Sequence, residues 1–125
     1  MTHPKTIRVV ETDKDLLSRL KRHTGVKGYN TLCRWGYCMS LADPNPTSVD
    51  PLGAASSLEI DWEVFAGAYK DVYWALLVQR VSEDGLDRDD ATLHREFYRH
   101  LHRGLGQLAN VAQRPTSRDI LLRIA

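Results

Sequence analysis

The sequence predicts a small, mainly α-helical protein with one short strand near its N-terminus. Apolar residues recur every three or four positions through most of the 125-residue chain, which is the spacing of amphipathic helices. A β-branched run, Ile7–Val10, fits a strand of four or five residues. Prolines and glycines separate the periodic segments and indicate about four helices. This length predicts a single domain, residues 1–125, with one core.

Two helices are predicted to follow the strand. Thr12 can cap the first helix, and Gly25 can supply the left-handed residue that ends it. Asn30 can cap the second helix, which the Asp43-Pro44 step ends. A strand followed by two helices is the layout of ribbon-helix-helix modules, in which strands from two subunits pair and enter the major groove of DNA.

The second half of the chain predicts two further helices. Residues 46–57 are rich in Pro, Gly, Ser and Thr and predict a loop. We expect the longest apolar pattern, from Trp62 to Leu77, to form one amphipathic helix at the centre of the core. Asp89 or Asp90 can cap the last helix, which Pro115 breaks. The apolar stretch 120–124 is expected to dock on the core or on a neighbouring subunit.

Charge is strongly segregated along a chain whose net charge is only +1. Residues 1–41 carry eight bases against three acids, residues 42–90 carry three against 11, and residues 91–125 carry six against two. A local excess of positive charge attracts polyanions, so the first third predicts a nucleic-acid partner. A merely solvated basic face is the alternative. The predicted strand offers only a few side chains that could contact base edges: Lys5 and Arg8, with Val10. So few contacts favour binding to the DNA backbone over sequence readout.

The sequence lacks the usual marks of an enzyme, a metalloprotein or a membrane protein. It contains no glycine-rich phosphate loop, nucleophile elbow or paired zinc cysteines, so we expect neither catalysis nor a cofactor. The strongest candidates for a catalytic or metal site lie on the last helix and are His94, Glu96, His100 and His102. We expect these side chains to face solvent rather than to form a site. We expect Cys33 and Cys38 to be small buried hydrophobes. Without an apolar membrane span or signal core, the prediction is a cytoplasmic protein.

Three ordered stretches resemble the DndE family of DNA sulfur-modification (phosphorothioation) proteins. The first runs from Arg19 to Gly25 and continues in Leu32-Cys33-Arg34 and Ser40-Leu41. The second is Glu59-Ile60-Asp61 with Gly67 six residues on, where the family usually has Asn in place of Asp61. The third is His102-Arg103-Gly104 with Leu108, although His100 is an alternative match for the family's histidine. The likeness covers about residues 7–110.

The resemblance implies a small, mostly helical protein that forms homotetramers and binds DNA, with a preference for nicked duplex attributed to basic surface residues. Such proteins act beside a cysteine desulfurase, an iron-sulfur protein and an ATPase in a modification system linked to restriction, and are not known as the catalyst. The resemblance therefore implies a DNA-binding accessory subunit whose basic residues contact the backbone: Lys14, Arg19, Lys21, Arg22, Lys27 and Arg34. A ribbon-helix-helix transcriptional regulator or antitoxin is the alternative.

Overall fold

The structure, a computed structural model, describes residues 2–113 and is mainly α-helical, as the sequence predicts. The elements in chain order are β1 (Thr6–Val10), α1 (Glu11–Thr24), α2 (Tyr29–Ala42), β2 (Ala55–Asp61), α3 (Trp62–Ala66), the 3₁₀ turn η1 (Gly67–Tyr69), α4 (Lys70–Glu83) and α5 (Asp90–Gln113). Within residues 2–113 no helix combines the length and apolar content needed to cross a bilayer. The predicted break at Pro115 and the apolar stretch 120–124 lie outside the described residues.

The two strands form a small antiparallel sheet within the chain. Ile7 of β1 pairs with Ile60 of β2, and both side chains are buried beneath the sheet. The predicted strand at the N-terminus is confirmed, but β2 was missed, because residues 46–57 read as loop and Ser56 and Ser57 open this strand. Since β1 pairs with β2 of the same chain, a ribbon-helix-helix start is not confirmed.

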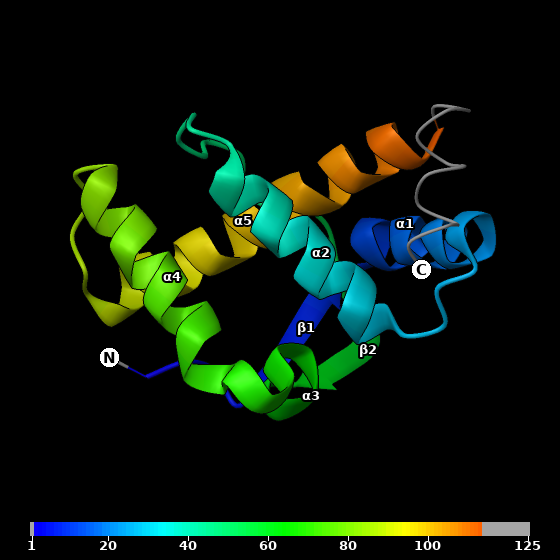
Figure 1. Ribbon diagram of the computed structural model, residues 1–125, viewed down its shortest axis with the longest axis horizontal. Coiled ribbons are helices and arrows are strands. Elements are labelled where there is room, and N and C mark those ends of the chain that lie inside the picture. Colours follow the sequence, from blue (N-terminus) through cyan, green and yellow to red (C-terminus); the bar gives the residue numbers. More distant parts are fainter. Residues whose placement is uncertain (1, 114–125) are drawn as a thin grey trace.

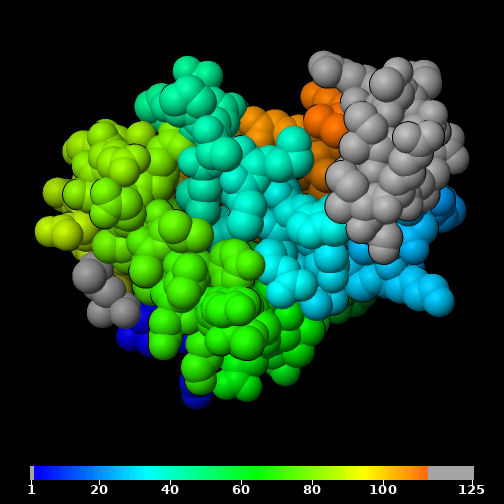
Figure 2. Space-filling model, viewed as in Figure 1, coloured from blue at the N-terminus to red at the C-terminus, as the bar shows by residue number. Residues whose placement is uncertain are grey.

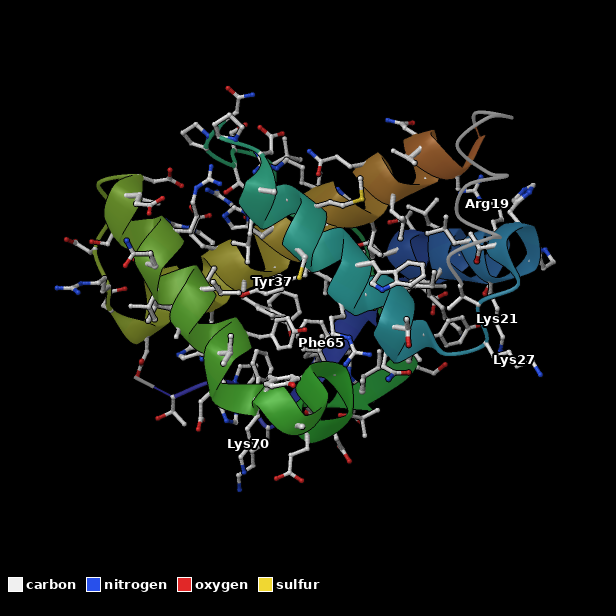
Figure 3. The ribbon with its side chains drawn as sticks, in the orientation of Figure 1. Arg19, Lys21, Lys27, Tyr37, Phe65 and Lys70 are labelled. Atoms are coloured by element: carbon white, nitrogen blue, oxygen red, sulfur yellow. The ribbon has the colours of Figure 1, made fainter. Side chains whose placement is uncertain are left out.

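The centre of the core is the crossing of α2 and α5, where α5 passes behind α2 (Figure 1). Gly36 and Gly104 face each other at this crossing, and a Cβ added to Gly36 would lie 2.9 Å from the carbonyl carbon of Gly104. Aromatic rings fill the space beside it, with the Tyr37 ring 5.1 Å from that of Phe97 and 5.5 Å from that of Phe65 (Figure 3). The backbones of α2 and α5 can approach this closely only because Gly36 and Gly104 have no side chains.

The segment from Trp62 to Leu77 is not one helix at the centre of the core, so that prediction is wrong. Gly67 has φ of +61°, a conformation that L side chains rarely adopt, and it breaks the segment into α3, η1 and α4. Trp62 and Leu77 remain buried, but Val72 is half exposed. The break turns part of the apolar pattern outward, which periodicity alone does not reveal.

The helix ends match the sequence in part. α1 begins one residue before Thr12 and α2 begins one residue before Asn30, so neither side chain caps its helix. The predicted stop at Gly25 is confirmed, because this residue has φ of +75° and ends α1 in the left-handed conformation. The cap at Asp89 is also confirmed, since its carboxylate accepts a hydrogen bond of 2.7 Å from the N–H of Thr92.

Candidate nucleic-acid interface

Four of the six predicted DNA-contacting residues gather at one end of the molecule. Arg19, Lys21 and Arg22 lie on the last turns of α1, and Lys27 lies in the connection to α2. All four side chains are exposed, and Figure 3 shows Arg19, Lys21 and Lys27 around the same end of α1. None of the four forms an ion pair with an acid of residues 2–113. We call these four residues the basic end.

Local chemistry explains why the chain turns here and holds its cations outward. The left-handed Gly25 stops α1, and its N–H donates to the carbonyl of Lys21 at 3.0 Å. The hydroxyl of Thr24 accepts the N–H of Val26 at 3.2 Å and so fixes the first residues of the connection. The Lys21 ammonium lies 4.9 Å from the centre of the Tyr29 ring, a cation–π contact that holds it near α2.

Positive charge at this place is also favourable for the helix itself. The C-terminal end of an α-helix carries a partial negative charge, and basic side chains in its last turn stabilise it by about 0.3–1 kcal/mol each. Lys21, Arg22 and His23 occupy that turn of α1. Helix stabilisation alone does not require Lys27, which lies beyond the helix and adds to the same exposed field.

Lys14 and Arg34 do not join the basic end. Lys14 lies near the start of α1, and its ammonium donates to the Ser57 hydroxyl of β2 at 3.0 Å. Arg34 is half buried on α2, and its guanidinium lies 3.3 Å from the position that a Cβ on Gly67 would take. Lys14 therefore contacts β2, and Arg34 lies beside η1. The structure brings together four of the six predicted residues and separates these two.

Two arginines of α5 are engaged inside the molecule rather than free on its surface. Arg99 forms an ion pair with Asp50 at 2.6 Å. Arg103 donates to both the hydroxyl and the carbonyl of Ser40 at 2.8 Å, and to the carbonyl of Asn45 at 2.6 Å. These bonds hold Arg103 against the C-terminal end of α2 and the loop that follows it. The α5 arginines thus contribute less to a DNA-facing surface than those of α1.

Two of the four candidate side chains on α5 are buried rather than solvent-facing, contrary to the prediction, whereas His94 and His102 are partly exposed. His100 is fully buried, and its Nδ1 lies 2.8 Å from the Ser40 hydroxyl, while buried Glu96 accepts a bond from Thr47 at 2.8 Å. Nδ1 of His100 and the Ser40 hydroxyl share this hydrogen bond, and Arg103 donates to the same hydroxyl oxygen. Burial, followed by the charge of Arg103, lowers the pKa of His100 to about 4.

The titratable groups do not assemble a metal site within the described part of the chain, where no three of His, Cys, Asp and Glu converge. Cys33 is fully buried, as predicted, and burial raises the pKa of its thiol to about 12. Cys38 is only half buried, and burial also raises its thiol pKa. Both cysteines are therefore thiols at neutral pH, the form that is a poor nucleophile and a poor metal ligand.

These features define a small, mainly helical domain with a two-stranded sheet, a tight α2–α5 crossing and an exposed cationic helix end. Two solved structures are similar to it, each covering 86% of this chain and 99% of the other. DndE from Escherichia coli B7A, involved in DNA phosphorothioation modification, has a TM-score of 0.67. A mutant of DndE with two glycines replaced by lysine has a TM-score of 0.66. Both are 18% identical to this chain, so the likeness is one of fold.

Sequence comparison places the chain in the same family. Residues 6–115 match the family described as DNA sulphur modification protein DndE, and the chain belongs to that family. No curated protein matches the chain significantly. The resemblance predicted from the three short stretches is thereby confirmed over nearly the whole chain.

Proposed function

We propose that the protein is a cytoplasmic DNA-binding accessory subunit of the DNA phosphorothioation machinery, which holds the DNA backbone through its basic end. The observation that carries the proposal is the exposure of four cations at one helix end without an acidic partner among residues 2–113: Arg19, Lys21, Arg22 and Lys27. Unpaired cations attract phosphates because each contact releases condensed counterions from the DNA. Membership of a DNA sulphur modification family supports DNA as the polyanion.

The contacts of Arg8 on β1 favour binding to the DNA backbone over readout of the base sequence. The guanidinium of Arg8 pairs with Glu59 at 3.0 Å and also donates to the carbonyl of Ser56 at 3.1 Å. A base-reading strand must present such side chains to the major groove. Arg8 instead binds two residues of β2. A ribbon-helix-helix regulator is therefore the weaker candidate.

An accessory rather than catalytic role is supported by the thiols. A sulfur-transferring cysteine acts as a thiolate. Burial raises the pKa of both Cys33 and Cys38, which keeps them protonated. We therefore assign sulfur transfer to other modification proteins and DNA holding to this chain.

A homo-oligomer, most simply a tetramer, would present several basic ends to one duplex. Two aromatic side chains of α2 contribute little to such an assembly, since Tyr37 is fully buried and Trp35 packs partly buried against the core. The α3–α4 surface, on the face toward the viewer in Figure 2, instead exposes apolar side chains. They are Val64, Tyr69, Val72 and Leu76, from 45% to 66% exposed. Exposed apolar side chains grouped on one surface are typical of association faces.

The proposal is tested by fluorescence anisotropy of labelled DNA over a range of salt concentrations. We expect binding that weakens with salt at a slope of about −0.9 per phosphate contact and is similar for unrelated sequences. An intact duplex and the same duplex with one nick, compared side by side, measure any preference for nicked DNA. A sequence-specific regulator would instead prefer its operator by about 10³-fold or more, which would contradict the proposal. Binding that does not respond to salt would also contradict it.

A further inference from the structure

A pocket of about 320 Å³ lies between α1, α5 and the loop at residues 46–49, away from the exposed basic end. Arg99, His102 and Gly106 of α5 form one wall, and Asp13 and Leu16 of α1 form another. Loop residues, among them Pro46 and Val49, cover it. Pockets of this size take small molecules, with apolar walls and a few converging polar groups that orient the ligand.

The polar centre of the pocket is an aspartate–histidine pair. The Asp13 side chain is almost completely buried, and its two oxygens lie 2.9 and 3.0 Å from Nδ1 of His102. A buried carboxylate needs such a partner, and the Nδ1–H of His102 supplies it by donating to the carboxylate. His102 is about one-third exposed, and its Nε2 has no hydrogen-bond partner among residues 2–113. Nε2 is therefore open to a ligand.

The guanidinium of Arg99 lines the pocket beside the histidine. Arg99 uses two of its nitrogens on Asp50, at 2.6 and 3.3 Å, while Nη1 has only a 3.8 Å contact with Glu96. Asp50 is half exposed and comes from the covering loop. An anionic ligand in the pocket can bind the remaining nitrogen of Arg99 or replace the Asp50 carboxylate.

The shape of the pocket depends on Gly106. A Cβ at this position would meet nothing within 4 Å, so the missing side chain leaves the α5 wall open. A smaller, separate cavity of about 50 Å³ also lies between α1 and α5, and Arg19 and Ala109 help to line it.

From these features we infer that the pocket binds a terminal phosphate, a phosphomonoester carried on a nucleotide, with His102 and Arg99 as its ligands. The inference rests on the proposed function, because the strand end that carries this phosphate is a DNA strand end. Phosphate oxygens are strong acceptors for the guanidinium of Arg99, and a monoester carries up to two negative charges near neutral pH. An internal phosphodiester is joined to nucleotides on both sides, whereas a terminal phosphate has a free side that can enter a pocket of about 320 Å³.

The direct test is a titration of the purified full-length protein with thymidine 5′-monophosphate, followed by NMR of its imidazole groups. We expect the His102 signals to shift and saturate, with no such response to thymidine and a weaker one to inorganic phosphate. His102→Gln should weaken binding about tenfold, roughly 1.4 kcal/mol. The amide of Gln can still donate to Asp13, so the fold should persist. His94→Gln is the matched control, because His94 lies on α5 outside the pocket and should leave binding unchanged.

A blocking variant separates this inference from the proposed function. Gly106→Leu fills the pocket without meeting protein atoms at its Cβ, so the variant should fold and bind intact duplex through the basic end as the parent does. It should lose both nucleotide binding and any preference for duplexes with a 5′-phosphate over a 5′-hydroxyl end. Nucleotide binding without a preference between the two duplex ends would identify a free phosphorylated metabolite as the ligand. Failure of the nucleotide to shift His102, or equal binding to the Gly106→Leu variant, would overturn the inference.

Discussion

The backbones of Gly36 and Gly104 are in direct contact where α2 crosses α5, so that a Cβ on Gly104 would overlap the carbonyl oxygen of Gly36. Both residues lie inside helices, where glycine costs about 0.5–1 kcal/mol relative to alanine. The close approach offsets this cost, because it brings the aromatic and leucine side chains of the two helices into one core.

Gly104→Ala should destabilise the protein by at least about 2 kcal/mol, because the two helices must move apart to admit the methyl group. Gly106→Ala, two residues further along α5, is the control. Its Cβ would meet nothing within 4 Å, so this change should be neutral or stabilise by about 0.5–1 kcal/mol. Urea unfolding followed by circular dichroism measures both. Equal stability of the Gly104→Ala protein would show that α2 and α5 do not pack this closely.

The buried His100 predicts a loss of stability in acid. Its pKa falls from 6.5 to about 4 on folding, so below pH 6.5 the unfolded chain binds a proton that the folded chain refuses. The stabilisation from the neutral imidazole is present in full above pH 6.5 and is lost as the pH falls to about 4. The free energy of unfolding should drop by on the order of 3 kcal/mol over this range.

His100→Gln tests the assignment, because its amide oxygen can still accept the Ser40 hydroxyl while the side chain does not titrate. Urea unfolding at several pH values should give a flatter pH dependence for this variant than for the parent. The same slope in both proteins would mean that another group causes the acid sensitivity.

The exposed α3–α4 face predicts the effect of charge on assembly. Val72→Asp together with Leu76→Asp should convert the oligomer to a 14 kDa monomer in light scattering, because both side chains would be buried between subunits. The monomer itself should remain folded, since these side chains are already about half exposed within it. An oligomer that survives the double change would exclude this face, and a parent protein that is monomeric at micromolar concentration would contradict the assembly.

Local signals in the sequence predicted much of the fold. The β-branched residues of β1, the glycine stop at Gly25 and the apolar repeat of α5 depend on neighbours within a few positions. β2 escaped prediction because its two serines read as loop and it is stabilised by pairing with β1, almost 50 residues away. The break at Gly67 escaped because one glycine inside a strong apolar repeat does not by itself end a helix.

The candidate site was predictable to the extent that it depends on charge. The basic end follows from residues close together in the chain. Lys14 was included because it is near them in sequence, and Arg34 because it belongs to the Leu32-Cys33-Arg34 stretch that resembles the family. Their contacts in three dimensions separate both from the basic end. The pairing of Asp13 with His102 joins residues 89 positions apart. No spacing rule within one helix could have found it.

The most direct test of the central claim is the salt-dependent DNA affinity of a Lys21→Glu, Arg22→Glu double variant. These changes replace attraction by repulsion at the basic end and leave the buried Leu17 and Leu20 untouched, so the fold should persist. Lys70→Glu with Arg88→Glu is the matched control, because it changes the charge equally at exposed sites outside α1 (Figure 3 labels Lys70).

We expect the double variant at the basic end to bind unrelated duplexes at least tenfold more weakly, about 1.4 kcal/mol, and with a flatter salt slope. The matched control should bind nearly as the parent does. If the folded basic-end variant binds DNA as tightly as the parent, the basic end is not the DNA-contacting surface and the account is wrong.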